Sequence, residues 1–285
     1  MKLGLSVFPT MASIHPTRLG REAEARGFES IFTVEHTHIP ASRRTPYPLG
    51  GDLPSTYWES FEPFTFLSMV AAVTRTLRIG TGICLVPQHH PIALAKRVAS
   101  LDALSGGRFL FGVGAGWNAE ELENHGVRYQ ERWKVLDESI AAMKTLWTEK
   151  DAGHHGHYFD FDPVWVEPKP LSQPHPPVLI GAASKWAIRR VVDYADGWLP
   201  VAVGDQLDER LEQMQRLCEE TGRDRDTLSV SVIGFVQSPA ELEVLARKGI
   251  DRVVLGVPTV EESQLLKILD GFAPIVAAAR ELSAT

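Results

Sequence analysis

The chain has 285 residues, of which 44% are hydrophobic and 23% are charged, and its formal net charge is −7. This composition is ordinary for a folded protein with a large core. The acidic balance gives no basic surface for nucleic acid. The sequence also shows no lysine- or arginine-rich helix of the kind that binds an acidic membrane surface.

Short apolar runs alternate with helical patterns along the whole chain. The first half predicts strand 3–8, helix 16–26, strand 30–34, helix 64–74, strand 78–86, helix 92–104, strand 109–113 and helix 131–147. The second half predicts strand 178–180, helix 185–195, strand 197–201, helix 207–220, strand 228–236, helix 241–248, strand 253–255 and helix 261–282. The strands are continuous apolar runs, which is typical of parallel strands covered on both faces.

Eight such strand–helix units predict an α/β fold, a single (β/α)8 TIM barrel over residues 1–285. A doubly wound open sheet is the structural alternative, and the absence of G-x-G-x-x-G after the first strand weakens it. Insertions at about 37–62 and 150–177 interrupt the rhythm, and long loops are often functional. The first follows a strand and should open on the catalytic face, whereas the second follows a helix and should start from the opposite face.

The remaining bulk features indicate the compartment. The first residues enter a strand directly and lack the apolar core and cleavage site of a signal peptide. No apolar run reaches the roughly 18 residues that a membrane span needs. The two cysteines, Cys84 and Cys218, do not indicate a disulfide framework. We therefore expect a cytoplasmic protein with no membrane partner.

Glu35 and His36 end the second predicted strand, at the rim where barrel enzymes place their catalytic groups. His36 could act as a general acid or base near neutral pH. Glu35 could orient this histidine or contact a substrate. The alternative is a carboxylate and two histidines, His36 and His38, in a polar loop.

Glycines recur in the third predicted strand, at Gly80-Thr81-Gly82-Ile83. Glycine inside a buried strand usually marks a bulge or a ligand close to the backbone. A planar ring lying on the strand would use such a site. The alternative is relief of crowding inside the barrel.

The fourth predicted strand ends in a second glycine run, residues 112–117. Gly114 and Gly116 would clear one face for a ligand, and Trp117 could form a wall of the pocket. Asn118 is a plausible cap for the helix that follows.

The run Gly181-Ala182-Ala183-Ser184 ends the next strand and enters a helix at Lys185. Small residues leave backbone N–H groups free, and a helix N-terminus attracts anions. This segment is a plausible phosphate seat, and a tight strand-to-helix turn is the alternative.

In order, these pieces resemble the luciferase-like monooxygenase superfamily of flavin oxidoreductases, especially its F420-dependent branch. The matching stretches are residues 34–36 with 39–40, 78–82, 95–96, 101–102, 104–108, 112–117, 167–170, 177–181 and 195–198.

The resemblance implies a flavin-type ring at the barrel mouth, against a bulged third strand with a non-proline cis peptide at Gly82–Ile83. The implied cofactor contacts are Thr81, Gly82, Ile83, Gly114, Gly116, Trp117 and the backbone of Gly181, Ala182, Ala183 and Ser184. The implied catalytic pair is Glu35 with His36, and relatives are often homodimers.

Two positions depart from the F420-dependent sugar-phosphate dehydrogenases. Ala41 stands at about the place of their tryptophan, and Trp117 stands where they carry a glutamate. The sugar-phosphate activity is therefore not transferred to this chain.

The expected function is hydride transfer between deazaflavin F420 and a small organic substrate, with the protein supplying binding and orientation. The alternative is an FMNH2-dependent two-component monooxygenase, for which FMN would replace F420. A metal-dependent barrel hydrolase would need several His or Asp ligands at different strand ends, and only His36 and His38 stand so, hence no metal is expected. A flavin-binding barrel without catalysis is the remaining alternative.

Overall fold

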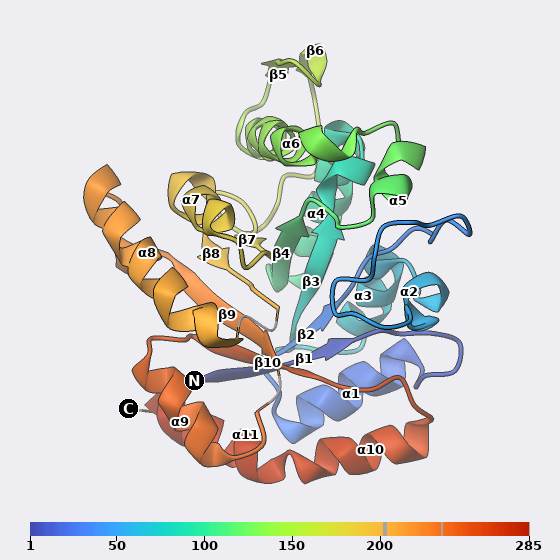
Figure 1. Cartoon of the computed structure of the whole chain (residues 1–285), viewed down its shortest axis with the longest axis vertical. Helices are drawn as coiled ribbons and strands as arrows, with labels where there is room; N and C mark the ends of the chain where they lie inside the picture. Colours follow the sequence, from blue (N-terminus) through green and yellow to red (C-terminus); the bar gives the residue numbers. More distant parts are fainter. Residues whose placement is uncertain (202–203, 235, 285) are drawn as a thin grey trace.

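The computed structural model describes residues 1–201, 204–234 and 236–284, and within them eight parallel strands close into a barrel (Figure 1). The order around the barrel is β1-β10-β9-β8-β7-β4-β3-β2. The barrel strands are β1 (Lys2–Val7), β2 (Ser30–Thr33), β3 (Arg78–Leu85), β4 (Phe109–Gly114), β7 (Val178–Ile180), β8 (Gly197–Trp198), β9 (Ser229–Gly234) and β10 (Arg252–Gly256). The TIM-barrel prediction is confirmed.

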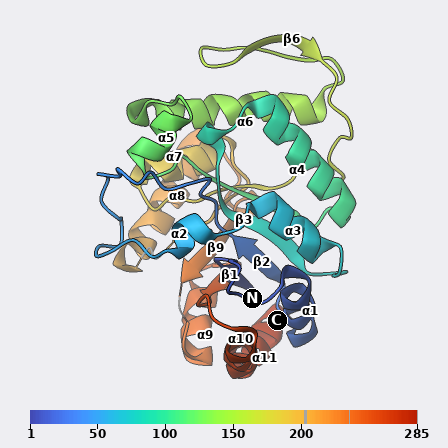
Figure 2. The ribbon, with the colours of Figure 1, turned by 90° about the vertical axis from the view of Figure 1, so that its right-hand side faces the viewer.

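Helices cover the outside of the barrel (Figure 2). They are α1 (Pro16–Arg26), α2 (Thr56–Glu59), α3 (Pro63–Ala71), α4 (Pro91–Ser105), α5 (Ala119–Asn124), α6 (Arg132–Thr148), α7 (Lys185–Tyr194), α8 (Leu207–Thr221), α9 (Pro239–Arg247), α10 (Glu262–Gly271) and α11 (Ala273–Ala284). Within the described ranges, no helix is long and apolar enough to cross a membrane.

Local sequence sets the helix ends. The first helix begins at Pro16, whose fixed φ suits the first turn, and ends at Gly27, which has φ 84° and donates its N–H back to the last turn. The single helix expected over 261–282 was wrong, because the structure forms α10 and α11 with a break at Phe272. Pro274 explains the break, since proline has no N–H and its ring clashes with the preceding turn.

Two strands also differ from their predicted lengths. The strand expected over 197–201 is only Gly197–Trp198, with Val201 in an isolated bridge to Ile233. The strand expected over 228–236 is Ser229–Gly234, and Phe235 lies outside the described residues.

Side chains along the strands point alternately to two apolar layers, one between the barrel and the helices and one inside the barrel. Ile31 faces the helices, whereas its neighbour Phe32 faces the barrel interior. The interior layer consists of Phe32, Leu110, Leu179, Leu199, Ile233 and Val254, with the half-buried Ile83 packed on it. An eight-strand barrel is just wide enough for such a filling, so the interior offers an apolar floor below the mouth rather than a pore.

The insertion at 150–177 contains a hairpin of β5 (Ala152–His155) and β6 (Asp160–Val164), which lies on the outer side of α6 (Figures 1 and 2). The carboxylate of Glu138 on α6 accepts the backbone N–H groups of residues 157, 158 and 159 at 3.1, 2.8 and 2.8 Å. These bonds fasten the turn of the hairpin to the helix. The insertion at 37–62 instead runs beside α5, at the strand ends that carry the candidate site (Figure 2).

Candidate active site

The loops after β2, β3 and β4 meet at one end of the barrel, because parallel strands end on the same side. His36 follows β2, and its Nδ1 lies 2.8 Å from Oε2 of Glu121 on α5. Both side chains are buried, with exposed fractions of 6% and 1%. The amide of Thr37 donates to the other oxygen of Glu121 at 3.3 Å. The structure therefore gives the orienting role expected of Glu35 to Glu121.

The second ring nitrogen of His36 is also engaged. Trp117 Nε1–H donates to His36 Nε2 at 3.3 Å. For Nε2 to accept this hydrogen bond, the ring proton must be on Nδ1. The Nδ1–H group then donates to the Glu121 carboxylate. In this arrangement Nδ1 of His36 faces Glu121, and the Nε2 lone pair faces Trp117.

An aromatic cluster surrounds that lone pair. The Tyr57 ring lies 5.1 Å from the His36 ring and 6.2 Å from the Trp117 ring, and Tyr47 lies 5.3 Å from Tyr57. Burial and the hydrogen bond with Tyr47 raise the pKa of Tyr57 above its usual value, so this phenol stays neutral. The walls beside the base are therefore mainly aromatic, and the Arg43 guanidinium lies 5.9 Å from the centre of the Trp117 ring.

The 37–62 insertion is tied to α5 next to this cluster. Glu120 accepts Arg44 N–H at 3.0 Å, and Thr45 N–H and Oγ1–H at 3.3 and 2.6 Å. These bonds, led by the Thr45 hydroxyl, lower the pKa of Glu120 to about 2. The insertion is thus held to the same short helix that carries Glu121.

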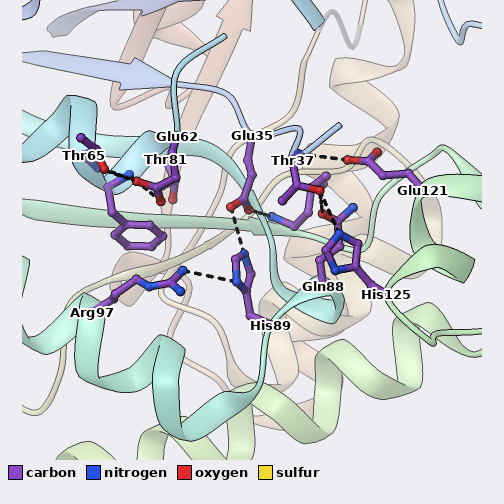
Figure 3. Close-up of polar contacts among 12 residues, drawn as sticks. Glu35, Thr37, Glu62, Thr65, Thr81, Gln88, His89, Arg97, Glu121 and His125 are labelled. Carbon is purple, nitrogen blue, oxygen red and sulfur yellow. Dashed lines mark hydrogen bonds and ion pairs between the residues drawn. The ribbon is translucent and has the colours of Figure 1, made fainter. Parts of the chain in front are cut away.

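The hydrogen-bond partners of Glu35 are Leu85 and His89 rather than His36. Its Oε2 accepts Leu85 N–H at 2.5 Å, and its Oε1 lies 2.9 Å from His89 Nε2 (Figure 3). Burial alone would raise the pKa of Glu35, but the bonds from His89 and Leu85 outweigh it and hold the pKa below its usual value. Glu35 is an ionised, fully engaged carboxylate.

Glu35, Cys84 and His89 also place metal-type donor atoms within 4.8 Å of one another. Arg97 lies behind His89, with its Nη1 3.4 Å from Nδ1. Arginine can only donate, so the His89 proton is on Nε2 and points at Glu35. In this structure His89 therefore donates to Glu35, and a metal at this position would have to displace that proton.

The bulge expected in the third strand is present. The pairing of β3 with β4 shifts between Thr81 and Cys84, and the peptide Gly82–Ile83 is cis. Both features were expected at this point. They set Ile83 at the mouth, on top of the interior layer.

The open space expected beside the glycines is not there. A Cβ at Gly114 or at Gly181 would overlap the side chain of Ile83, and one at Gly80 would overlap the ring of Phe32. The structure thus favours the alternative of relieved crowding at these glycines, and a ligand contact there stays a prediction. They make room for two interior side chains, because the barrel interior is crowded.

Two further residues that were predicted to contact the cofactor make hydrogen bonds within the protein. Thr81 is fully buried, and its hydroxyl donates to the Gly112 carbonyl at 2.7 Å. The Gly116 carbonyl accepts Arg132 Nε–H at 3.1 Å. These groups are thus engaged in hydrogen bonds within the protein, and their contact with a cofactor stays a prediction.

The predicted phosphate seat forms the start of α7. Ser184 caps the helix by accepting Ala187 N–H at 3.3 Å. The carbonyls of Ala182 and Ala183 accept from Trp198 Nε1 at 2.8 Å and Arg210 Nε at 3.1 Å. The guanidinium of Arg210 therefore lies next to this helix N-terminus.

Sequence reasoning missed Glu121 and Tyr57, which lie far from His36 along the chain. It also missed two buried amides, Gln88 Nε2 and Asn118 Nδ2, which have no partner among the described residues. Asn118 was expected only as a cap, and its Oδ1 does accept Glu121 N–H at 3.2 Å. A polar residue on a short helix gives no sequence signal that would have marked these positions.

The profile of the family described as luciferase-like monooxygenase matches residues 14–271. The chain belongs to this family. An uncharacterized protein of Mycobacterium tuberculosis (strain H37Rv) is 38% identical over 266 residues, which is 90% of this chain and 92% of the relative. The family assignment makes the chain a luciferase-like oxidoreductase or monooxygenase.

Solved structures of the luciferase-like fold superpose on most of the chain. An F420-dependent secondary alcohol dehydrogenase in complex with an F420–acetone adduct has a TM-score of 0.77 at 18% identity, covering 98% of this chain and 100% of that chain. The oxygenating constituent of 3,6-diketocamphane monooxygenase from Pseudomonas putida, in complex with FMN, has a TM-score of 0.66 at 21% identity, covering 87% and 72%. At these identities the likeness establishes the fold.

Proposed function

We propose that the chain is an F420-dependent oxidoreductase that transfers a hydride between the deazaflavin and a small organic alcohol or carbonyl compound. The observation that carries this proposal is the His36–Glu121 pair, which leaves a basic nitrogen at the barrel mouth between aromatic walls. The likeness to an F420-dependent secondary alcohol dehydrogenase supports the same assignment.

The residues at the mouth fit a planar ring carried on a phosphate chain. Ile83 and the apolar layer beneath it offer a flat hydrophobic floor. The first turn of α7 offers N–H groups to an anion, with Arg210 beside it. We therefore assign the ring to Gly82, Ile83 and Trp117. The phosphate is assigned to Ala182–Ser184 and Arg210, because the Gly181 N–H already donates to the Val113 carbonyl at 2.8 Å. When bound, F420 supplies the carbon that accepts or releases the hydride.

His36 moves the proton that accompanies the hydride. In the oxidative direction, Nε2 accepts the hydroxyl proton of the alcohol as its C–H bond is lost, and in reverse the imidazolium returns that proton to the carbonyl oxygen. Glu121 stabilises the imidazolium, because its carboxylate already accepts Nδ1–H at 2.8 Å. Trp117 and Tyr57 exclude water from the same side.

The second candidate is an FMNH2-dependent monooxygenase. The FMN-bound likeness favours it, because the apolar floor would take either ring. The proton-handling pair at His36 favours the hydride transfer, because a buried base oriented by a carboxylate suits an alcohol substrate.

We also propose that the enzyme is cytoplasmic and forms a homodimer. Size-exclusion chromatography with light scattering would test the dimer by measuring the molar mass in solution.

The deciding experiment titrates the purified protein with F420 and, separately, with FMN, and follows the fluorescence of each ring. We expect F420 to bind in the micromolar range or tighter and FMN at least about tenfold more weakly, a difference of about 1.4 kcal/mol. His36→Ala should keep the F420 affinity but reduce turnover of a secondary alcohol about 10²- to 10⁴-fold. Tight FMN binding with no change in F420 fluorescence would overturn the assignment in favour of the monooxygenase.

A further inference from the structure

The pairing of β2 with β3 ends before the bulge. The last paired residues are Thr33 and Thr81, and the register of β3 against β4 changes just beyond them. Leu85 therefore lies past the end of β2, where no strand carbonyl of β2 can accept its N–H. Glu35 accepts it instead, with its side-chain Oε2 at 2.5 Å. The carboxylate thus extends the β2–β3 ladder across the bulge.

A chain of donors holds this carboxylate in place. Arg97 on α4 donates to His89 Nδ1 at 3.4 Å, and His89 donates through Nε2 to Glu35 Oε1 at 2.9 Å. Figure 3 shows His89 lying between Glu35 and Arg97. The Glu35 side chain is 2% exposed and that of His89 is 11% exposed. Each oxygen of the buried carboxylate therefore has its own donor, which is the condition for keeping a charge inside a protein.

We propose that Glu35 is a positioning residue that locks the bulged end of β3, and that Arg97 and His89 hold it in that role. The locked segment carries Ile83, whose side chain fills the space next to Gly114 and forms the top of the interior layer. A displaced bulge would move this floor. The link from the lock to cofactor binding rests on the proposed function, whereas the lock itself does not.

The lock is tested by amide hydrogen exchange, measured by mass spectrometry on peptides that span β3. Glu35→Gln offers one oxygen to two donors, Leu85 N–H and His89 Nε2–H, so one of them loses its acceptor. We expect exchange at the end of β3 to speed up at least about tenfold, the effect of losing one hydrogen bond to a charged acceptor. Arg97→Met leaves the Leu85 bond intact and should give a smaller increase in the same peptide.

The matched control is Glu29→Gln. Glu29 is paired with Arg252 at 2.7 and 2.8 Å and precedes β2, so it lies at the opposite end of the barrel from the site. This variant reports the effect of general destabilisation. The proposal is overturned if, at equal free energy of unfolding, Glu35→Gln opens the end of β3 no more than Glu29→Gln does.

A second readout separates positioning from proton transfer. Glu35→Gln should weaken F420 binding about tenfold and leave the shape of the pH–rate profile unchanged, whereas Glu121→Gln should alter that profile and leave the affinity near wild type. A changed profile in Glu35→Gln would contradict the positioning role. If wild-type protein binds no F420, the proposed function fails while the exchange experiment still decides the lock.

Discussion

His36 Nδ1 lies 2.8 Å from Glu121 Oε2, although 85 positions separate the two residues in the sequence. Both belong to loops or short helices that follow barrel strands, so the fold brings them together at the mouth. Glu121 is itself held by the Asn118 cap and by Thr37 N–H. The base of the proposed reaction is therefore oriented by a fixed carboxylate.

The first prediction concerns this pair. Glu121→Gln keeps the shape of the side chain but removes the charge that stabilises the imidazolium. Turnover of a secondary alcohol should fall about 10- to 100-fold, less than the loss expected from removing the base itself. Steady-state kinetics with saturating F420 would measure it. An unchanged kcat would mean that Glu121 has no part in proton transfer.

The second prediction concerns the competitor for His36 Nε2. Trp117→Phe keeps an aromatic ring but removes the N–H that occupies this nitrogen. A substrate hydroxyl then no longer has to displace it, so KM should fall about two- to tenfold at similar kcat, the net value of one hydrogen bond. Tyr57→Phe is the control, because its hydroxyl donates to Tyr47 rather than to His36. A higher KM in Trp117→Phe would show that the indole binds the substrate directly.

The third prediction tests the packing around Ile83. Gly114→Ala would overlap Ile83 Cδ1, and overpacking of this kind costs about 1–3 kcal/mol of unfolding free energy. In an Ile83→Val background the cost should be smaller, because valine lacks that atom. Gly181→Ala is the matched control, since it meets Cγ2, which valine retains. Urea unfolding of the single and double variants would measure the coupling. We expect Gly114→Ala to be coupled to Ile83→Val, and Gly181→Ala not to be.

The fourth prediction concerns pH. The folded-state pKa of Glu120 is about 2, below the usual 4.5, so its contribution to stability is present above 4.5 and is lost as the pH falls toward 2. Glu120→Gln should therefore be less stable than wild type at neutral pH, and the difference should shrink through that range. Unfolding curves of both proteins at several pH values would check this. A difference that stays constant down to pH 2 would contradict the assignment.

The sequence predicted the barrel well, because buried parallel strands and amphipathic helices leave periodic patterns. It placed His36 at the mouth because strand ends define the rim, whereas the bulge with its cis peptide at Gly82–Ile83 was implied by the resemblance to the luciferase-like family. It could not find the partners. Glu35 and Glu121 are both carboxylates near the rim, and only the three-dimensional path of the backbone decides which one meets the histidine.

The glycines show a related physical limit of sequence analysis. A missing side chain in a strand indicates that something else needs the room, but the pattern does not say whether that is a ligand or a neighbour. Here Phe32 and Ile83 are the neighbours, and both point inward from other strands. Relief of crowding was the stated alternative for the glycines of the third strand, and spacing alone could not choose between it and a ligand.

The side chain of Ile83 fills the space where a side chain would stand at Gly114 on β4 and at Gly181 just after β7. Three segments of the barrel therefore cannot change independently during evolution. Valine at position 83 would lack the Cδ1 that blocks a side chain at Gly114, but Gly181 could be replaced only where the Cγ2 atom is also lost. Residue 83 and the two glycines should consequently vary as a linked set among relatives, because each glycine is needed only while the atom of Ile83 beside it is present.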